Sequence, residues 1–334
     1  MSYDAIEHTI MIQVDEVVDA DGTHINARVL PPYDNPANLV FTNTYDPNDA
    51  VLSGNTSIHG IKQLTGRDIQ PDEKFYFTLS AYDDNAKTVL ENPKTVEVAS
   101  LNDDGVADFD FGEMSFSREG RYTFKVDETT ADGSDTADVD NGLTFDTNVC
   151  IVEVNVEDDG SGTLKASVSY RNNIHADIQD KALFINNYES NMNYGAQGAG
   201  GIEITKVLEN HAMDAGDFTF HISGADSGTV TAEEANEKLA DEDRTFTNGR
   251  SSSDIPFVMK KLQSVTFNQD DAGKTFSFIV DEEEPSTGKL AGVSYDQRQY
   301  RVDIEVYDNG DGTMYTLTTV TEGSTVIIDK VKFQ

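Results

Sequence analysis

Apolar and polar residues alternate in short runs along most of the chain, and this period of two is typical of β-strands that bury one face. In residues 120–128, for example, Tyr122, Phe124 and Val126 share one face, and Glu128 is next in the same phase. Gly, Asp and Asn separate the runs and favour turns. The pattern predicts an all-β protein with strands near residues 9–14, 24–30, 58–64, 73–80, 106–111, 114–116, 120–128, 145–156, 164–170, 182–188, 202–208, 217–222, 275–282 and 300–307.

The order of these strands repeats along the chain. A Phe-x-Asn-x-Tyr stretch occurs at residues 41–45 and again at 184–188, and Lys62 and Lys206 occupy the same place in two similar strands. A repeat of this length indicates tandem modules rather than one large domain. A third marker, an aromatic residue followed by Asp, occupies the equivalent place in each copy, at Tyr3-Asp4, Phe145-Asp146 and Tyr295-Asp296.

The repeat predicts three parts. Residues 1–46 match the C-terminal part of an incomplete module, residues 57–189 form a complete module, and residues 201–334 form a module that lacks its closing Asn strand. Two stretches rich in Asn, Ser, Gly and Asp, 47–56 and 189–200, have the composition of linkers. We therefore expect the chain to be a window of a longer array.

One segment departs from the strand pattern. Residues 231–243 begin with Thr231 and carry Glu234 three positions later, which is the capping box that starts many helices. Leu239 then supplies an apolar position for packing. We expect one short helical insertion in an otherwise all-β unit.

Composition narrows the classes of partner. The chain has 61 acidic and 24 basic residues and a net charge of -37, so nucleic acid and anionic membranes are excluded as partners. No apolar stretch is long enough to span a bilayer, and no membrane insertion is expected in this chain.

The single cysteine, Cys150, lies in an apolar run and is expected in the core. One thiol forms no internal disulfide, so the fold needs another source of stability.

Three residue types recur at equivalent places and suggest a chemistry. Lys62 lies in an apolar first strand, Glu128 ends an aromatic middle strand, and Asn186 lies in the last strand. Burial makes a lysine a neutral nucleophile and keeps a carboxyl protonated, and such a pair can join the amine to a carboxamide with loss of ammonia. The spacing alone favours ordinary exposed or ion-paired side chains, because alternating strands normally carry polar residues on the face of the sheet that meets solvent.

The motifs resemble the streptococcal-type pilin isopeptide-linkage domain of Gram-positive pilins and surface adhesins. The resemblance rests on four stretches in order: Ile61–Arg67, Tyr122–Glu128, Phe145-Asp146 and Phe184–Tyr188. It implies tandem immunoglobulin-like β-sandwiches of the collagen-adhesin B type. It also implies a cross-link between Lys62 and Asn186 with Glu128 as catalyst, and Glu282 as the equivalent catalyst in the third unit. Lys206 and Asn43 are then cross-link candidates without a partner in their own unit.

The same resemblance implies a function. We expect a structural stalk segment of a cell-surface pilin or adhesin, extracellular and attached to the cell wall, which is no enzyme beyond one self-cross-linking turnover and needs no cofactor. Its partners would be neighbouring modules or subunits of the same fibre. An alternative is an adhesin module whose insertion at residues 224–256 recognises a host ligand, and an exposed aromatic patch there would favour it. A third class, a glycosidase with paired carboxylates, lacks a segment with aromatic sugar platforms.

Two acidic stretches are predicted to form turns. Residues 158–162 and 308–312 follow an Asp-x-Gly-x-Gly pattern, which resembles part of a calcium loop. No distant glutamate completes a calcium-binding pattern, and Asp-Gly is a strong hairpin signal. We therefore expect two hairpin turns and no metal site.

Overall fold

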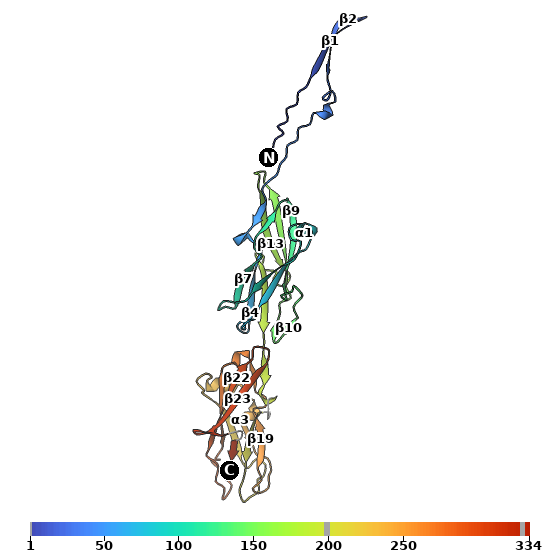
Figure 1. Cartoon of the computed structure of the whole chain (residues 1–334). Helices are drawn as coiled ribbons and strands as arrows, with labels where there is room; N and C mark the ends of the chain where they lie inside the picture. The colour runs from blue at the N-terminus through green and yellow to red at the C-terminus, as the bar shows by residue number, and fades with distance from the viewer. Residues whose placement is uncertain (1, 197–200, 328–330) are drawn as a thin grey trace.

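The computed structural model describes residues 2–196, 201–327 and 331–334. It is an elongated molecule in which a thin hairpin segment, a middle unit and a C-terminal unit follow one another in a row (Figure 1). Strands dominate, and the only α-helices in the described residues are α1 (Asp84–Lys87), α2 (Ala232–Glu237) and α3 (Asp241–Arg244). The all-β expectation is confirmed.

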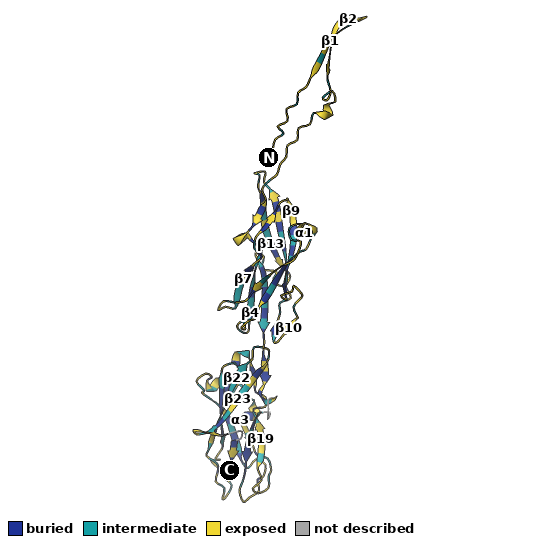
Figure 2. Cartoon of the chain, in the orientation of Figure 1, coloured by how far each residue is buried: buried dark blue, intermediate teal, exposed yellow. Residues whose placement is uncertain are grey.

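The hairpin segment, residues 2–46, consists of β1 (Ile12–Asp19) and β2 (Gly22–Val29), which pair antiparallel. β2 lies close to its predicted run, whereas β1 begins three residues later and ends five residues later than the run predicted at 9–14, and the turn falls at Ala20-Asp21. None of the described residues in this segment is buried (Figure 2). The apolar side chains described in this segment therefore form no hydrophobic core.

The middle unit is a sandwich of two five-stranded sheets around one hydrophobic core, which runs from Ala50 to Tyr188. The first sheet has the order β10-β11-β14-β4-β7, with bounds Val139–Asp140, Leu143–Thr144, Ala182–Tyr188, His59–Thr65 and Val106–Asp110. The second has the order β13-β12-β9-β5-β6, with bounds Leu164–Asn172, Val149–Asp158, Gly120–Thr129, Phe75–Ala81 and Lys94–Val98.

Alternation decides which side chains enter this core. On β9, Tyr122, Phe124 and Val126 are buried while the residues between them are half-buried, and Glu128 continues the buried phase. On β4, Lys62 occupies a buried position between Gly60 and Leu64. A period of two therefore carries two charged side chains into the space between the sheets.

The C-terminal unit has the same plan around a second core, which runs from Met192 to Phe333. One sheet has the order β19-β16-β25, with bounds Phe257–Lys261, Ile202–Lys206 and Val331–Phe333. The other has the order β18-β17-β21-β22-β23-β24, with bounds Thr245–Thr247, Thr219–Ala225, Thr275–Glu282, Gln299–Asp308, Met314–Glu322 and Thr325–Ile327.

Both stretches with a linker composition contain strands. β3 (Ala50–Leu52) pairs with β8 (Met114–Phe116) and buries Ala50 and Leu52. β15 (Asn191–Asn193) pairs with β20 (Thr266–Asn268) and buries Met192. The linker expectation is wrong for these residues, because short strands within polar stretches show no periodicity of their own. Residues 197–200 of the second stretch lie outside the described residues.

The expectation of one helical insertion also needs correction. The segment that begins at Thr231 forms two short helices, α2 and α3, and a third, α1, lies in the middle unit. The capping box is present as predicted, because the Thr231 side chain accepts from the Glu234 backbone and the Glu234 side chain accepts from the Thr231 backbone. α1 is a single turn capped by Asp83, too short for a periodic apolar pattern.

The remaining expectations concern burial. Cys150 is buried in the middle core as predicted, and burial raises the pKa of its thiol to about 12. Among the described residues, no helix has the length and apolarity needed to cross a membrane. Within the same residues, no group of three or more His, Cys, Asp or Glu side chains is placed to hold a metal ion.

Candidate functional site

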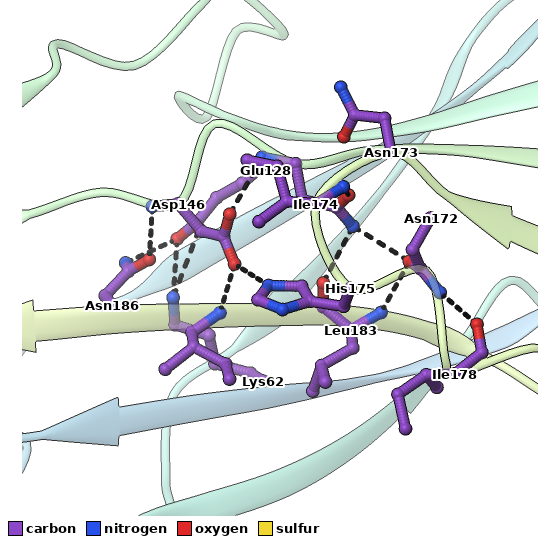
Figure 3. A network of polar contacts seen from close by, with 12 residues as sticks. Lys62, Glu128, Asp146, Asn172, Asn173, Ile174, His175, Ile178, Leu183 and Asn186 are labelled. Atoms are coloured by element: carbon purple, nitrogen blue, oxygen red, sulfur yellow. Dashed lines mark hydrogen bonds and ion pairs between the residues drawn. The ribbon is translucent and has the colours of Figure 1, made fainter.

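Three strands bring the predicted site residues together in the middle unit. β4 carries Lys62 and pairs in parallel with β14, which carries Asn186. Glu128 lies near the end of β9 in the opposite sheet. All three side chains point into the core between the sheets, where Lys62 and Asn186 are fully buried and Glu128 is 6% exposed (Figure 3).

Glu128 contacts both other members of this set. Lys62 Nζ donates to Glu128 Oε1 at 2.9 Å and to Oε2 at 3.1 Å. Asn186 Nδ2 donates to the same Oε1 atom at 2.8 Å. One carboxyl oxygen therefore lies between the amine and the amide nitrogen, where it can receive a proton from one and deliver it to the other.

Burial sets the ionisation of the pair. Loss of solvent lowers the pKa of Lys62 to about 8, against the opposing effect of the nearby Glu128. The same loss of solvent raises the pKa of Glu128. The Phe75 ring, with its centroid 4.4 Å from Lys62 Nζ, adds to the apolar surroundings. Both shifts favour the uncharged forms, an amine and a carboxylic acid.

Asp146 holds the asparagine in place. Its backbone N–H donates to Asn186 Oδ1 at 2.9 Å, and its carboxylate accepts from the Ile185 backbone N–H at 2.6 Å. His175 Nε2 lies 2.7 Å from the same carboxylate (Figure 3). We call Asp146, with its bonds to Ile185 and Asn186, the aspartate clamp. Sequence reasoning identified Asp146 only as a marker of the repeat.

A buried amide network supports the same strand from the other side. Asn148 Nδ2 donates to Asn172 Oδ1 at 2.8 Å and to the Leu183 carbonyl at 2.9 Å. Asn172 Nδ2 donates to the carbonyls of Ile178 and Lys181. These bonds tie β14 to the ends of β12 and β13. Sequence reasoning missed both asparagines, because Asn is common in loops and nothing in the local pattern indicates burial.

The C-terminal unit repeats much of this arrangement. Lys206 Nζ lies 2.7 Å from Glu282 Oε2, and both side chains are buried. Phe333 on β25 lies opposite Lys206, as Phe184 lies opposite Lys62 in the middle unit. The structure thus brings Glu282 to the lysine, while the adjacent Glu283 contacts His221.

One of the two bonds of the aspartate clamp recurs there as well. Asp296 accepts from the Gln334 backbone N–H at 2.8 Å, as Asp146 does from Ile185. Lys206 Nζ donates in addition to the Gln334 carbonyl at 3.3 Å. Among the described residues, none is hydrogen-bonded to Glu282 Oε1, the oxygen that corresponds to the amide contact of Glu128.

Asn43 and Thr42 form with Asp4 the bonds of the aspartate clamp, but no lysine or glutamate in the described part of the chain completes the site there. The Asp4 backbone N–H donates to Asn43 Oδ1 at 3.0 Å, and the Asp4 carboxylate accepts from the Thr42 backbone N–H at 2.8 Å. Asn43 is exposed, and among the described residues no lysine–glutamate pair lies against it. The structure therefore brings Lys62, Glu128 and Asn186 together, pairs Lys206 with Glu282, and leaves Asn43 apart from both.

One protein-family model matches the chain twice. The family model of FctA, described as the Spy0128-like isopeptide containing domain, matches residues 58–189 and matches again over residues 202–334. The two matches cover most of the chain. A comparison with curated proteins finds no match.

Solved structures give a weaker likeness. The major pilin from Streptococcus pyogenes is 18% identical, with a TM-score of 0.32, and the match covers 86% of this chain and 97% of that one. The major pilin protein T-13 from the same species is 14% identical, with a TM-score of 0.29, and the match covers 85% and 97%. The assignment of the chain therefore rests on the family model.

Proposed function

Because the chain belongs to the FctA family of Spy0128-like isopeptide-containing domains, we propose that it is a stalk segment of a Gram-positive pilus or fibrillar surface adhesin, strengthened by a Lys62–Asn186 amide bond that it forms by itself. The observation that carries this proposal is the placement of Glu128 Oε1 between the two reacting side chains, 2.9 Å from Lys62 Nζ and 2.8 Å from Asn186 Nδ2.

The proposed reaction needs no group from outside the chain. The uncharged Lys62 amine attacks Cγ of Asn186, and a new C–N bond forms. Glu128 receives a proton from the amine and delivers one to Nδ2, so that the C–Nδ2 bond breaks and ammonia leaves. The products are one amide bond and one ammonia molecule, and Glu128 returns to its starting state. Proximity within the folded core supplies much of the acceleration.

Asp146 has a defined part in this reaction. Attack on Cγ places negative charge on Asn186 Oδ1, and the Asp146 N–H already donates to that atom. A preorganised donor at the developing oxyanion lowers the barrier. The Asp146 carboxylate keeps this donor in place through its bond to the Ile185 N–H. We propose Asp146 as a positioning residue of the site.

The cross-link suits a load-bearing fibre. It would join β4 to β14, two neighbouring parallel strands at the centre of one sheet. A pulling force that enters along either strand would then pass through covalent bonds rather than through the packed core. In a chain with one cysteine, this bond takes the place that a disulfide has in other extracellular domains.

The same proposal covers location and partners. We propose a place outside the cell, on its surface, with further modules or subunits of the same fibre as partners. We divide the chain at the boundaries expected from the repeat, 1–46, 57–189 and 201–334, and assign residues 50–52 to the middle unit because β3 pairs within it.

The intact mass of the purified, denatured chain tests the cross-link. We expect the wild type to be lighter than its sequence by one ammonia, and Glu128→Ala to have its full mass. Tryptic digestion should place the link between the peptides that carry Lys62 and Asn186. A wild type at full mass would refute the cross-link and leave only the fold-level relationship.

The host-ligand alternative finds no support in the insertion. Phe246 is the only aromatic residue in 224–256, and it packs against Phe220 in the C-terminal core. The exposed aromatic patch that would favour ligand recognition is therefore missing from this segment. We retain the stalk function as the proposal.

A further inference from the structure

The ends of the repeated Phe-x-Asn-x-Tyr stretches make contacts that the cross-link does not use. Tyr188 is the last residue of β14 and is fully buried, although it lies at the end of the middle unit. Its hydroxyl donates to Asp308 Oδ1 at 2.7 Å. Asp308 belongs to the acidic turn of the C-terminal unit, 120 positions along the chain.

The same contact occurs one step earlier in the chain. The Tyr45 hydroxyl, at the end of the first Phe-x-Asn-x-Tyr stretch, donates to Asp158 Oδ1 at 2.9 Å. Asp158 begins the acidic turn of the middle unit, as Asp308 does in the next unit. Both aspartates also accept from a turn glycine, Gly160 or Gly310, through the same Oδ1 atom. Two independent junctions therefore use one pair of residue types.

We infer that the terminal tyrosine of each Phe-x-Asn-x-Tyr stretch and the Asp-x-Gly-x-Gly turn of the following unit form a latch that fixes the orientation of neighbouring modules. The partner that this surface fits is another β-sandwich module with an Asp-x-Gly-x-Gly hairpin at its facing end. The inference concerns the joint between modules and is independent of the proposed amide bond.

Further contacts hold Tyr188 and Asp308 in place at the second junction. Ser190 Oγ donates to Asp308 Oδ2 at 2.7 Å, and the Gly312 N–H donates to the Tyr188 hydroxyl at 3.0 Å. The tyrosine oxygen thus both donates and accepts across the joint. The Arg67 guanidinium lies 4.7 Å from the centre of the Tyr188 ring, and Glu73 fixes that guanidinium through two bonds of 2.8 Å.

The backbones of the two units are also in close contact, at Gly142 and Gly312. Gly142 and Gly312 have positive φ angles, and a side-chain carbon at Gly142 would lie 2.6 Å from the Gly312 Cα. Such a close approach is open only to glycine on both sides. The last glycine of the Asp-x-Gly-x-Gly turn thus makes a close contact between the two units.

The two junctions differ in how far they enclose the tyrosine. At the first junction Tyr45 is 41% exposed, and the additional bonds join the Asn48 backbone to Gly162 and Leu164. At the second junction Tyr188 is fully enclosed. Burial and the hydrogen bond to Asp308 both raise the pKa of Tyr188, so its hydroxyl stays a donor at neutral pH. We therefore test the latch at Tyr188.

Distance measurement between spin labels tests the latch in the full chain. Ser169→Cys and Ser264→Cys provide exposed sites in the middle and C-terminal units, while Cys150 is fully buried and stays unlabelled. We expect a single narrow distance with Tyr188 in place and a loss of that narrow distribution with Tyr188→Phe. Gly312→Ala, which disturbs the joint from the other unit, should have the same effect.

Tyr300→Phe is the matched control. It removes a buried hydroxyl that donates to the Lys332 carbonyl inside the C-terminal unit. We expect it to leave the distance unchanged. The inference is overturned if Tyr188→Phe and Gly312→Ala both keep the wild-type distribution, or if Tyr300→Phe broadens it equally. The mass deficit is measured on the same samples, so that a failed latch and a failed cross-link are distinguished.

Discussion

At the scale of single residues, the middle unit places one amine, one carboxyl and one carboxamide in a largely apolar core. An unpaired charge at such a position is costly, so the three groups depend on one another. Glu128 contacts both Lys62 and Asn186, and burial favours the uncharged forms of Glu128 and Lys62. The energetic cost of burying these groups is thus linked to the chemistry we propose for them.

The aspartate clamp gives the first residue-scale prediction. Asp146→Ala keeps the backbone N–H but removes the bond that fixes it to β14, and a misplacement of about 1 Å costs on the order of 100-fold in rate. We expect freshly purified Asp146→Ala to contain chains at full mass that convert over time. The intact mass at successive times measures this conversion.

Asp296→Ala is the control for the clamp, since it removes the equivalent bond to Gln334 in the C-terminal unit. It should show the full ammonia deficit from the first sample. Complete conversion of Asp146→Ala at the earliest time would contradict a positioning role for that carboxylate.

The lowered pKa of Lys62 gives a prediction for pH. In Asn186→Ala, which cannot form the bond, Lys62 titrates near pH 8 when folded and near its ordinary 10.5 when unfolded. Between these values the unfolded state binds more protons, so the free energy of unfolding rises with pH. From pH 7.5 to 9.5 the expected gain is about 2 kcal/mol.

Chemical denaturation at the two pH values measures this gain. The double variant Asn186→Ala, Lys62→Met removes the titrating amine, and the difference between the two variants isolates its contribution. Equal pH dependence in both variants would show that Lys62 is not buried in the way the structure describes.

At the scale of elements, the parallel pair β4 and β14 is the centre of the middle unit. Parallel neighbours are far apart in the chain, and here almost the whole module lies between them. An amide bond across this pair closes a long loop in the unfolded state, which raises the free energy of that state. In our proposal, the strand pair that carries the chemistry is therefore also the one whose linkage stabilises the unit.

Loss of the link should weaken the middle unit alone. By analogy with a disulfide that closes a loop of about 100 residues, we expect Asn186→Ala to lower its free energy of unfolding by about 4–5 kcal/mol. Thermal and denaturant unfolding measure the effect. The C-terminal unit, which keeps its own core, should unfold as in the wild type.

Asn187→Ala provides the comparison on the same strand. Asn187 contacts Thr65 and Glu189 and takes no part in the site. A loss as large for Asn187→Ala as for Asn186→Ala would mean that packing of β14, and not the link, accounts for the change.

At the scale of the whole molecule, two packed units follow a segment that has no core of its own (Figure 2). Local stability follows buried contacts, so the hairpin segment should open far more readily than either unit. The units carry their load through their cores and, in our proposal, through a covalent bond and a latch.

Limited proteolysis tests this gradient. Arg28 is the only basic residue before Lys62 that trypsin recognises, and it lies exposed on β2. We expect cleavage after Arg28 to precede every other cut, with the two packed units left intact. Early cleavage at Lys165 or Arg171, on β13 of the middle unit, would contradict it.

The sequence by itself determined many of the strands and singled out Lys62, Glu128 and Asn186 as one set. Alternation placed Glu128 in phase with the apolar residues of its strand and Lys62 within an apolar strand, and the repeat matched Asn186 with Asn43. These features are local or periodic, and a single chain displays them directly. Glu282 continues the phase of Phe278 and Val280 on its strand in the same way.

Only the tertiary structure decided the contacts between distant, non-periodic residues. The Asp146 clamp, the buried Asn148 and Asn172 network and the Tyr188–Asp308 latch join residues from separate strands and loops. Polar loop residues have the same composition whether they are solvated or buried in a network. The partner, and not the local pattern, decides their role, and the partner is set by how the sheets fold against one another.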